Sequence, residues 1–95
     1  MFQSIDKRLK KIGFIKLHGE DEESKYGVCY RRKFEEYSHC QRLDIYHKES
    51  GRHLIISYQE GINAHGLNNA YGLTYKEMKL AMKKYQQMKR RYGWK

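Results

Sequence analysis

Six basic residues near the C-terminus have the chemistry and the spacing to bind anions. They recur at helical intervals between positions 76 and 91, and Glu77 is the only acid in that stretch. A cationic row of this kind pairs with the phosphates of a nucleic acid and displaces their counterions. A solvated helix face is the alternative, although such faces usually mix both signs of charge. The sequence therefore predicts a nucleic-acid-binding face formed by Lys76, Lys79, Lys83, Lys84, Arg90 and Arg91.

A second basic surface is expected on the outer face of a β-sheet. Alternation along the strands puts cations beside Tyr46 and Ile55, an arrangement similar in kind to platforms that stack the bases of single strands. A solvated sheet face would explain most of these positions equally well, but not an exposed ring opposite a β-branched residue. The cations of this surface are Arg31, Lys33, Arg42, Lys48 and His53.

The histidines and cysteines lack the spacing of a metal site. No pair has the two-to-four-residue separation of a zinc knuckle, and adjacent residues such as His39 and Cys40 point apart in an extended chain. We therefore expect no metal and no cofactor. The two cysteines, Cys29 and Cys40, are expected to be reduced thiols, because two cysteines do not make the disulfide framework of a secreted domain.

Composition indicates one small domain, residues 1–95, with a strong positive charge. Twenty Lys and Arg stand against eleven Asp and Glu, so the formal net charge is +9, and residues 20–23 hold four of the acids. This balance favours polyanionic partners. No apolar run approaches the roughly 18 residues of a membrane span, and charges interrupt the N-terminal region where a signal peptide would lie. We expect a cytoplasmic protein that does not enter the membrane.

The last helix is expected to begin at Thr74 and to end at Gly93. Thr74 and Glu77 have the spacing of a capping box, and glycine commonly terminates a helix. Its apolar stripe is predicted to face the core, and Leu80 to lie exposed among the cations. The predicted stripe consists of Tyr75, Met78, Ala81, Met82, Tyr85, Met88 and Tyr92.

A short first helix is predicted before the strands. Ser4 or Asp6 can cap it, and Gly13 should end it. Its apolar face would consist of Ile5, Leu9 and Ile12. A brief extended segment at residues 14–17 and an acidic loop at residues 19–24 should follow.

Two-residue periodicity predicts antiparallel strands at residues 26–35, 42–48 and 54–58. Ser50 and Gly51 are expected to form a two-residue hairpin loop. The resulting register would pair Leu43 with Tyr58, Ile45 with Ile56 and His47 with Leu54, all facing the core. Residues 59–73 are rich in Gly and Asn, so we expect a long loop there.

These elements predict an α+β fold of two layers. An antiparallel meander of three or four strands would form one layer, and the N-terminal and C-terminal helices would pack on one of its faces, in the order α-β-β-β-α. This order of elements resembles the double-stranded-RNA-binding fold.

Two short stretches resemble known families. Leu-Lys-Lys-Ile-Gly-Phe at residues 9–14 resembles the helix-to-strand entry of HicA-type toxins, which share the double-stranded-RNA-binding fold. Those toxins carry a catalytic histidine in a Gly-Ser-His stretch, where this chain has Ser-Lys-Tyr-Gly-Val at residues 24–28, so their ribonuclease activity is not implied. Together with a Tyr-rich meander, Gly-Leu-Thr-Tyr-Lys-Glu-Met at residues 72–78 is similar to small phage and prophage proteins of Gram-positive bacteria.

Three functional hypotheses follow. The first is a non-enzymatic, phage-type protein that binds nucleic acid through the basic face of the last helix. The second is a protein-interaction module, such as an inhibitor or adaptor of nucleic-acid-handling machinery, with its oligomeric state open. The third is a small ribonuclease, in which His47, His53 or His65 would act as the base. Catalysis by a cysteine–histidine pair would need Cys40 and His39, and it is disfavoured because sequence neighbours in a turn rarely meet in productive geometry.

Overall fold

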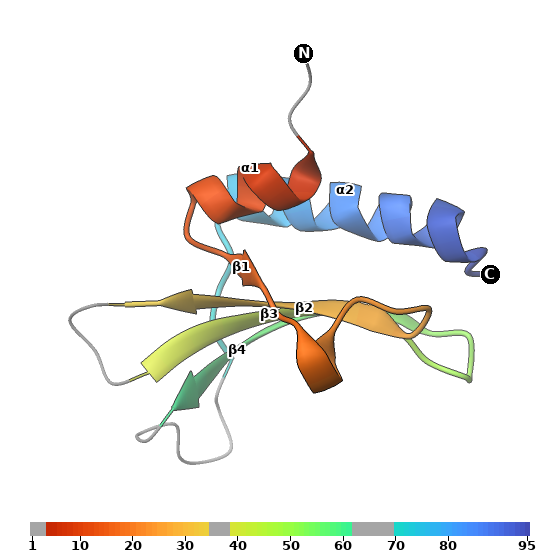
Figure 1. The fold of residues 1–95 in the computed structure, drawn as a ribbon, viewed down its shortest axis with the longest axis horizontal. Helices are drawn as coiled ribbons and strands as arrows, with labels where there is room; N and C mark the ends of the chain where they lie inside the picture. The colour runs from red at the N-terminus through yellow and green to blue at the C-terminus, as the bar shows by residue number, and fades with distance from the viewer. Residues whose placement is uncertain (1–3, 35–38, 62–69) are drawn as a thin grey trace.

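The computed structural model describes residues 4–34, 39–61 and 70–95 and has two layers. Two helices lie side by side above one face of a four-stranded antiparallel sheet (Figure 1). This confirms the predicted α+β class, with the order α-β-β-β-β-α. The elements are α1 (Ile5–Lys11), β1 (Ile15–Lys16), the 3-10 turn η1 (Gly19–Asp21), β2 (Gly27–Lys33), β3 (His39–His47), β4 (His53–Gly61) and α2 (Tyr75–Tyr92).

Both helices begin and end where their capping residues predict. The Ser4 side chain accepts a hydrogen bond from the Lys7 amide at the start of α1. Thr74 forms the complete capping box with Glu77, and Gly93 ends α2 in the left-handed conformation at φ +65°. These local signals therefore determine where each helix lies along the chain, although not which of its faces is buried.

The predicted register between β3 and β4 is wrong by one residue. Gly51 adopts φ +87°, and the loop holds three residues, 49–51, closed by a hydrogen bond from the Lys48 amide to the Arg52 carbonyl. The extra loop residue shifts every cross-strand pair of β3 and β4 by one position. A shift of one residue exchanges the two faces of a strand. The observed pairs are Leu43 with Ser57, Ile45 with Ile55 and His47 with His53.

The buried face of α2 also differs from the predicted one, because the helix is rotated by roughly 90° about its axis. The helix buries Leu80, which was predicted to be exposed, together with Glu77, Ala81, Lys84 and Met88. Exposed instead are Tyr75, Met78 and Met82 at 77%, 40% and 43%. With so many charges on α2, neither described helix has the length and apolar content needed to cross a membrane.

Glu77 is buried because a cation from the sheet meets it. An oxygen of its carboxylate lies 2.6 Å from Arg32 Nη1, and the Arg32 guanidinium also lies 4.3 Å from the centre of the Phe14 ring. Burial would raise the pKa of Glu77, but hydrogen bonds from the Thr74 backbone and from Arg32 lower it overall. The pairing of Arg32 with Glu77 therefore places the start of α2 over β2.

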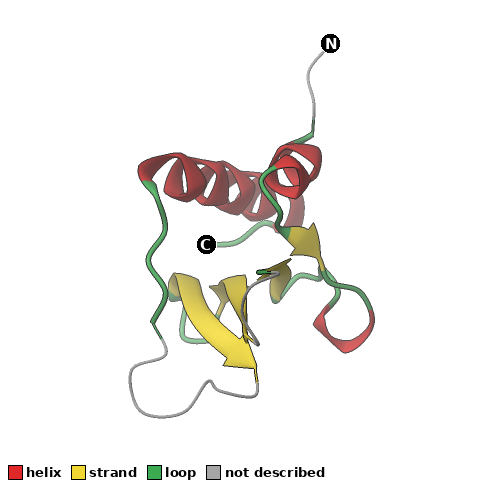
Figure 2. Cartoon of the chain, turned by 90° about the vertical axis from the view of Figure 1, so that its left-hand side faces the viewer, coloured by secondary structure: helices red, strands yellow, loops and turns green. Residues whose placement is uncertain are grey.

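The segment after α2 completes the core. Figure 2 shows the chain turning back between the helices and the sheet. The Trp94 side chain is only 5% exposed, its ring stacks on His47 at 5.3 Å, and its Nε1 donates a hydrogen bond of 2.7 Å to the Lys25 carbonyl. Trp94 joins the cluster formed by Leu9, Phe14, Val28, Tyr30, Leu43, Ile45, Leu80, Ala81 and Met88.

We expect Trp94→Ala to lower the free energy of unfolding by about 3–5 kcal/mol, because it leaves a cavity between the layers. Trp94→Phe keeps a ring there and should cost less. Urea denaturation followed by circular dichroism measures both. Tyr75→Ala is the control, since that ring is 77% exposed, and it should change stability by about 0.5 kcal/mol or less. A Trp94→Ala protein as stable as the control would contradict this role.

Candidate nucleic-acid interface

The two arginines predicted on the outer sheet face are paired with acids. Arg31 Nη2 lies 2.6 Å from Glu60, and Arg42 Nη1 lies 2.9 Å from the same carboxylate. Arg42 also contacts Asp44 at 3.2 Å and is itself buried. Their charge is therefore largely balanced within the protein. Of the cations predicted here, Lys33 and Lys48 are exposed, at the two ends of the sheet face.

The aromatic residue of that predicted platform is held in a network centred on a buried acid. Asp44 is fully buried and accepts hydrogen bonds from the hydroxyls of Tyr46 at 2.7 Å and Tyr58 at 2.8 Å. Burial and the hydrogen bond to Asp44 raise the pKa of both tyrosines. Ile55, predicted to lie beside Tyr46, packs instead against the core beneath the helices. The face therefore does not present Tyr46 and Ile55 as one stacking surface.

His53 faces the helices, contrary to its predicted place on the outer face. Its Nδ1 lies 2.6 Å from the Tyr85 hydroxyl and its Nε2 lies 2.9 Å from the Lys95 carbonyl. The Lys95 carbonyl only accepts hydrogen bonds, so Nε2–H donates to it, and Nδ1 shares a hydrogen bond with the Tyr85 hydroxyl. Both ring nitrogens are thus engaged in holding the C-terminal segment. His47 stacks on Trp94, and His65 lies outside the described residues.

The described cysteines and histidines do not gather into a metal site. Within residues 4–34, 39–61 and 70–95, no three His, Cys, Asp or Glu side chains come close enough together to hold an ion. Cys29 is buried and Cys40 is partly exposed, and neither forms a disulfide. Burial and the nearby Asp44 raise the pKa of the Cys29 thiol, which favours its unreactive form.

The cations of α2 fall into two groups, and Lys84 and Arg91 belong to the structural one. The prediction placed Lys84 on the exposed face, but the residue is only 1% exposed. Its Nζ lies 2.8 Å from Glu23 and 3.2 Å from Asp6. Arg91 also pairs with Glu23. The burial of Lys84 cannot be predicted from the hydrophobic pattern, because its acidic partners lie far away in the sequence.

Lys16 completes a partly buried network of alternating charges, which we call the charge network: Asp6, Lys16, Glu23 and Lys84. Lys16 Nζ lies 3.0 Å from Asp6 and 2.8 Å from Glu23, so each ammonium group touches both carboxylates. Tyr30 donates a hydrogen bond to Asp6. Burial alone would raise the pKa of Glu23, but hydrogen bonds from Lys16, Lys84 and Tyr92 lower it far below its ordinary value.

The second group of cations lines a groove between α1 and α2, and none of the described acids pairs with them. Two adjoining hollows that share Lys83 form this α1–α2 groove. Arg8 was not predicted as a member of the site, because the sequence does not show which residues of α1 lie beside α2. The cations of the groove are Arg8, Lys76, Lys79, Lys83 and Arg90.

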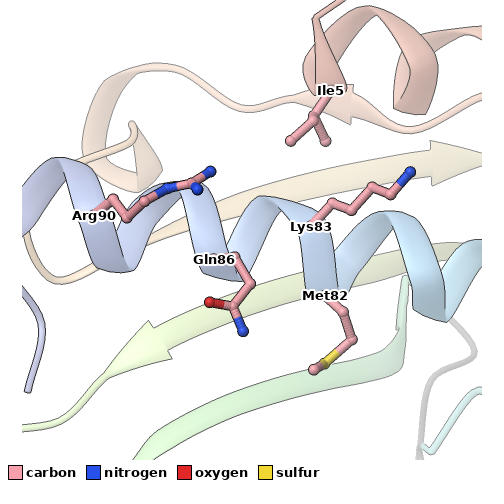
Figure 3. Close-up of a pocket in the computed structure, with 5 residues that line it drawn as sticks. All are labelled: Ile5, Met82, Lys83, Gln86 and Arg90. Atoms are coloured by element: carbon pink, nitrogen blue, oxygen red, sulfur yellow. The ribbon is translucent and has the colours of Figure 1, made fainter.

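The larger hollow has a volume of about 360 Å³ and combines cations with apolar and amide groups. Ile5 approaches from α1, Lys83 and Arg90 extend on the α1 side of α2, and Met82 and Gln86 extend on its other side (Figure 3). The hollow is open to solvent and offers charged, hydrogen-bonding and apolar contacts together. Such a surface can hold an extended anion that also has flat apolar parts.

We expect Lys84→Ala to lower the free energy of unfolding by about 3–5 kcal/mol, because it removes a fully buried cation that contacts two partly buried carboxylates. The adjacent Lys83 is the matched control: it is exposed and has no described ion pair, so Lys83→Ala should cost about 0.5 kcal/mol or less. Urea denaturation compares the two. Equal effects would contradict the structural role of Lys84.

The charge network also predicts loss of stability in acid. The pKa values of Glu23 and Asp6 are lowered in the folded protein from their ordinary values of 4.5 and 3.8. As the pH falls through those ordinary values, the unfolded chain therefore binds more protons than the folded protein. The free energy of unfolding should therefore be at its full value above about pH 5 and fall as the pH decreases below it. Denaturation at several pH values measures this. Glu23→Gln should flatten the dependence, and an unchanged slope would refute the assignment.

No protein-family model, curated protein or solved structure matches this chain. The resemblances to HicA-type toxins, to the double-stranded-RNA-binding fold and to phage proteins therefore stay predictions. What the molecule itself offers is a groove lined by five cations, none of which pairs with an acid among the described residues.

Proposed function

We propose that the protein is a non-enzymatic nucleic-acid-binding module that holds phosphates in the α1–α2 groove. The observation that carries this proposal is the contrast between two sets of cations. Arg31, Arg42 and Lys84 are neutralised by acids within the fold. The cations of the groove have no such partner among the described residues. A cation left unpaired on a protein with a net charge of +9 attracts polyanions.

The spacing of the groove residues supports a linear ligand. Positions 76, 79, 83, 86 and 90 of α2 follow alternating steps of three and four, so they form a nearly straight row along the helix. The row is about 21 Å long at 1.5 Å per residue. It therefore extends past several successive phosphates of a nucleic-acid backbone, which lie about 3.4 Å apart along each strand of a duplex. Gln86 is the one uncharged member of the row.

The triple variant Lys79→Gln, Lys83→Gln and Arg90→Gln tests the proposal. Fluorescence anisotropy with a labelled mixed-sequence oligonucleotide, repeated over a range of salt concentrations, gives the dependence of log Kobs on log[salt]. We expect the magnitude of the slope to fall by about 2–3, since three phosphate contacts are lost, and binding at low salt to weaken.

The matched control removes the same charge elsewhere, with Lys33→Gln, Lys48→Gln and Arg52→Gln. All three are exposed and lie outside the groove. This variant should keep most of the slope, and circular dichroism should show both variants folded. If the control loses as much as the groove variant, binding reflects net charge alone. If the wild-type protein binds no nucleic acid at low salt, the proposal fails.

A further inference from the structure

Beside the α1–α2 groove, α2 exposes a row of apolar side chains that the core does not use. Tyr75, Met78 and Met82 are 77%, 40% and 43% exposed, and their spacing of three and four residues aligns them along the helix. Tyr85 and Met88, farther along α2, belong instead to the buried core or pack against it. We call the three exposed residues the apolar row.

Each member of the apolar row is followed directly by a cation of the groove. Lys76 follows Tyr75, Lys79 follows Met78 and Lys83 follows Met82. The apolar row therefore borders about the first half of the groove along α2, and none of the described acids lines either hollow. A single-sign charge pattern beside exposed apolar groups indicates a ligand that is anionic along one edge and apolar along the other.

Tyr75 is the best-placed residue to receive such a ligand. Lys79 Nζ lies 5.3 Å from the centre of its ring, a cation–π contact that helps to orient the ring, while the side chain stays 77% exposed. At the other end of the row, Met82 lies with Gln86 in the larger hollow. The Gln86 amide can both donate and accept hydrogen bonds at the edge of a base.

We infer that the site prefers single-stranded nucleic acid, with an unpaired base stacked on Tyr75 and the next phosphates held by the groove lysines. The inference rests on the proposed function and specifies its ligand. A single strand offers charged phosphates together with exposed base faces, whereas a duplex hides those faces in its stack. Only the single strand therefore uses the groove and the apolar row together.

Anisotropy titrations of a labelled single strand and of the corresponding duplex, at the same salt concentration, test the inference. The wild-type protein should bind the single strand more tightly. Tyr75→Ala should weaken single-strand binding about fivefold or more, and duplex binding less than about twofold, because only the stacking contact is lost. Tyr75→Phe keeps the aromatic face and should retain single-strand affinity. An abasic strand should bind the wild-type protein as weakly as the intact strand binds Tyr75→Ala.

Tyr26→Ala is the matched control, since Tyr26 is another exposed tyrosine, at 57%, outside the groove. It should leave the affinity for both ligands unchanged. Equal wild-type affinity for single strand and duplex, or an equal loss of both in Tyr75→Ala, would overturn the inference while leaving the proposed function intact. Absence of all nucleic-acid binding at low salt would overturn both. Self-association through the apolar row, detected by sedimentation and abolished by Tyr75→Ala, would overturn the further inference alone.

Discussion

The contact between two partly buried carboxylates and two ammonium groups determines how the layers of this protein fit together. Asp6 comes from α1, Lys16 from β1, Glu23 from the segment after η1 and Lys84 from α2. Lys84 is fully buried and the other three residues are partly shielded from water, so Lys84 depends on the presence of both carboxylates. Because Lys84 must point inward to meet its partners, the rotation of α2 is set, and with it the choice of residues that face solvent.

Local signals in the sequence predicted the helices and strands well. The strand register and the buried face of α2 were predicted wrongly, because they depend on loop conformation and on pairs of residues far apart in the sequence. Capping residues located both helices, and two-residue alternation located the strands. The predicted register between β3 and β4 was wrong because Gly51, in its left-handed conformation, allows a loop of three residues instead of two. The predicted buried face of α2 was wrong because helical periodicity assigns charged residues such as Glu77 and Lys84 to the solvent side. In the folded protein Glu77 pairs with Arg32, and Lys84 pairs with Asp6 and Glu23, so both are buried. Trp94 was overlooked because it follows the end of the helix.

The sequence predicted only part of the candidate site, because it does not show which distant side chains pair. The row of cations on α2 was visible in the sequence, and four of its six members line the groove. Separating Lys84 and Arg91 from that row required knowledge of Glu23, which lies more than half the chain away. Likewise, the sequence does not show that Arg31 on β2 and Arg42 on β3 both pair with Glu60 on β4. Counts of basic residues therefore overstate the charge available to a ligand.

Two neighbouring lysines of α2 meet very different surroundings, since Lys84 is 1% exposed and Lys83 is open to solvent. Mobile ions screen exposed charges within about 10 Å at 0.1 M salt but reach buried pairs far less. Ionic strength therefore acts on the surface of this helix and hardly on its interior. Salt alone should therefore release the proposed anionic ligand from the groove while the pairs of Lys84 keep the layers together, so the free protein should be obtainable folded and without denaturant.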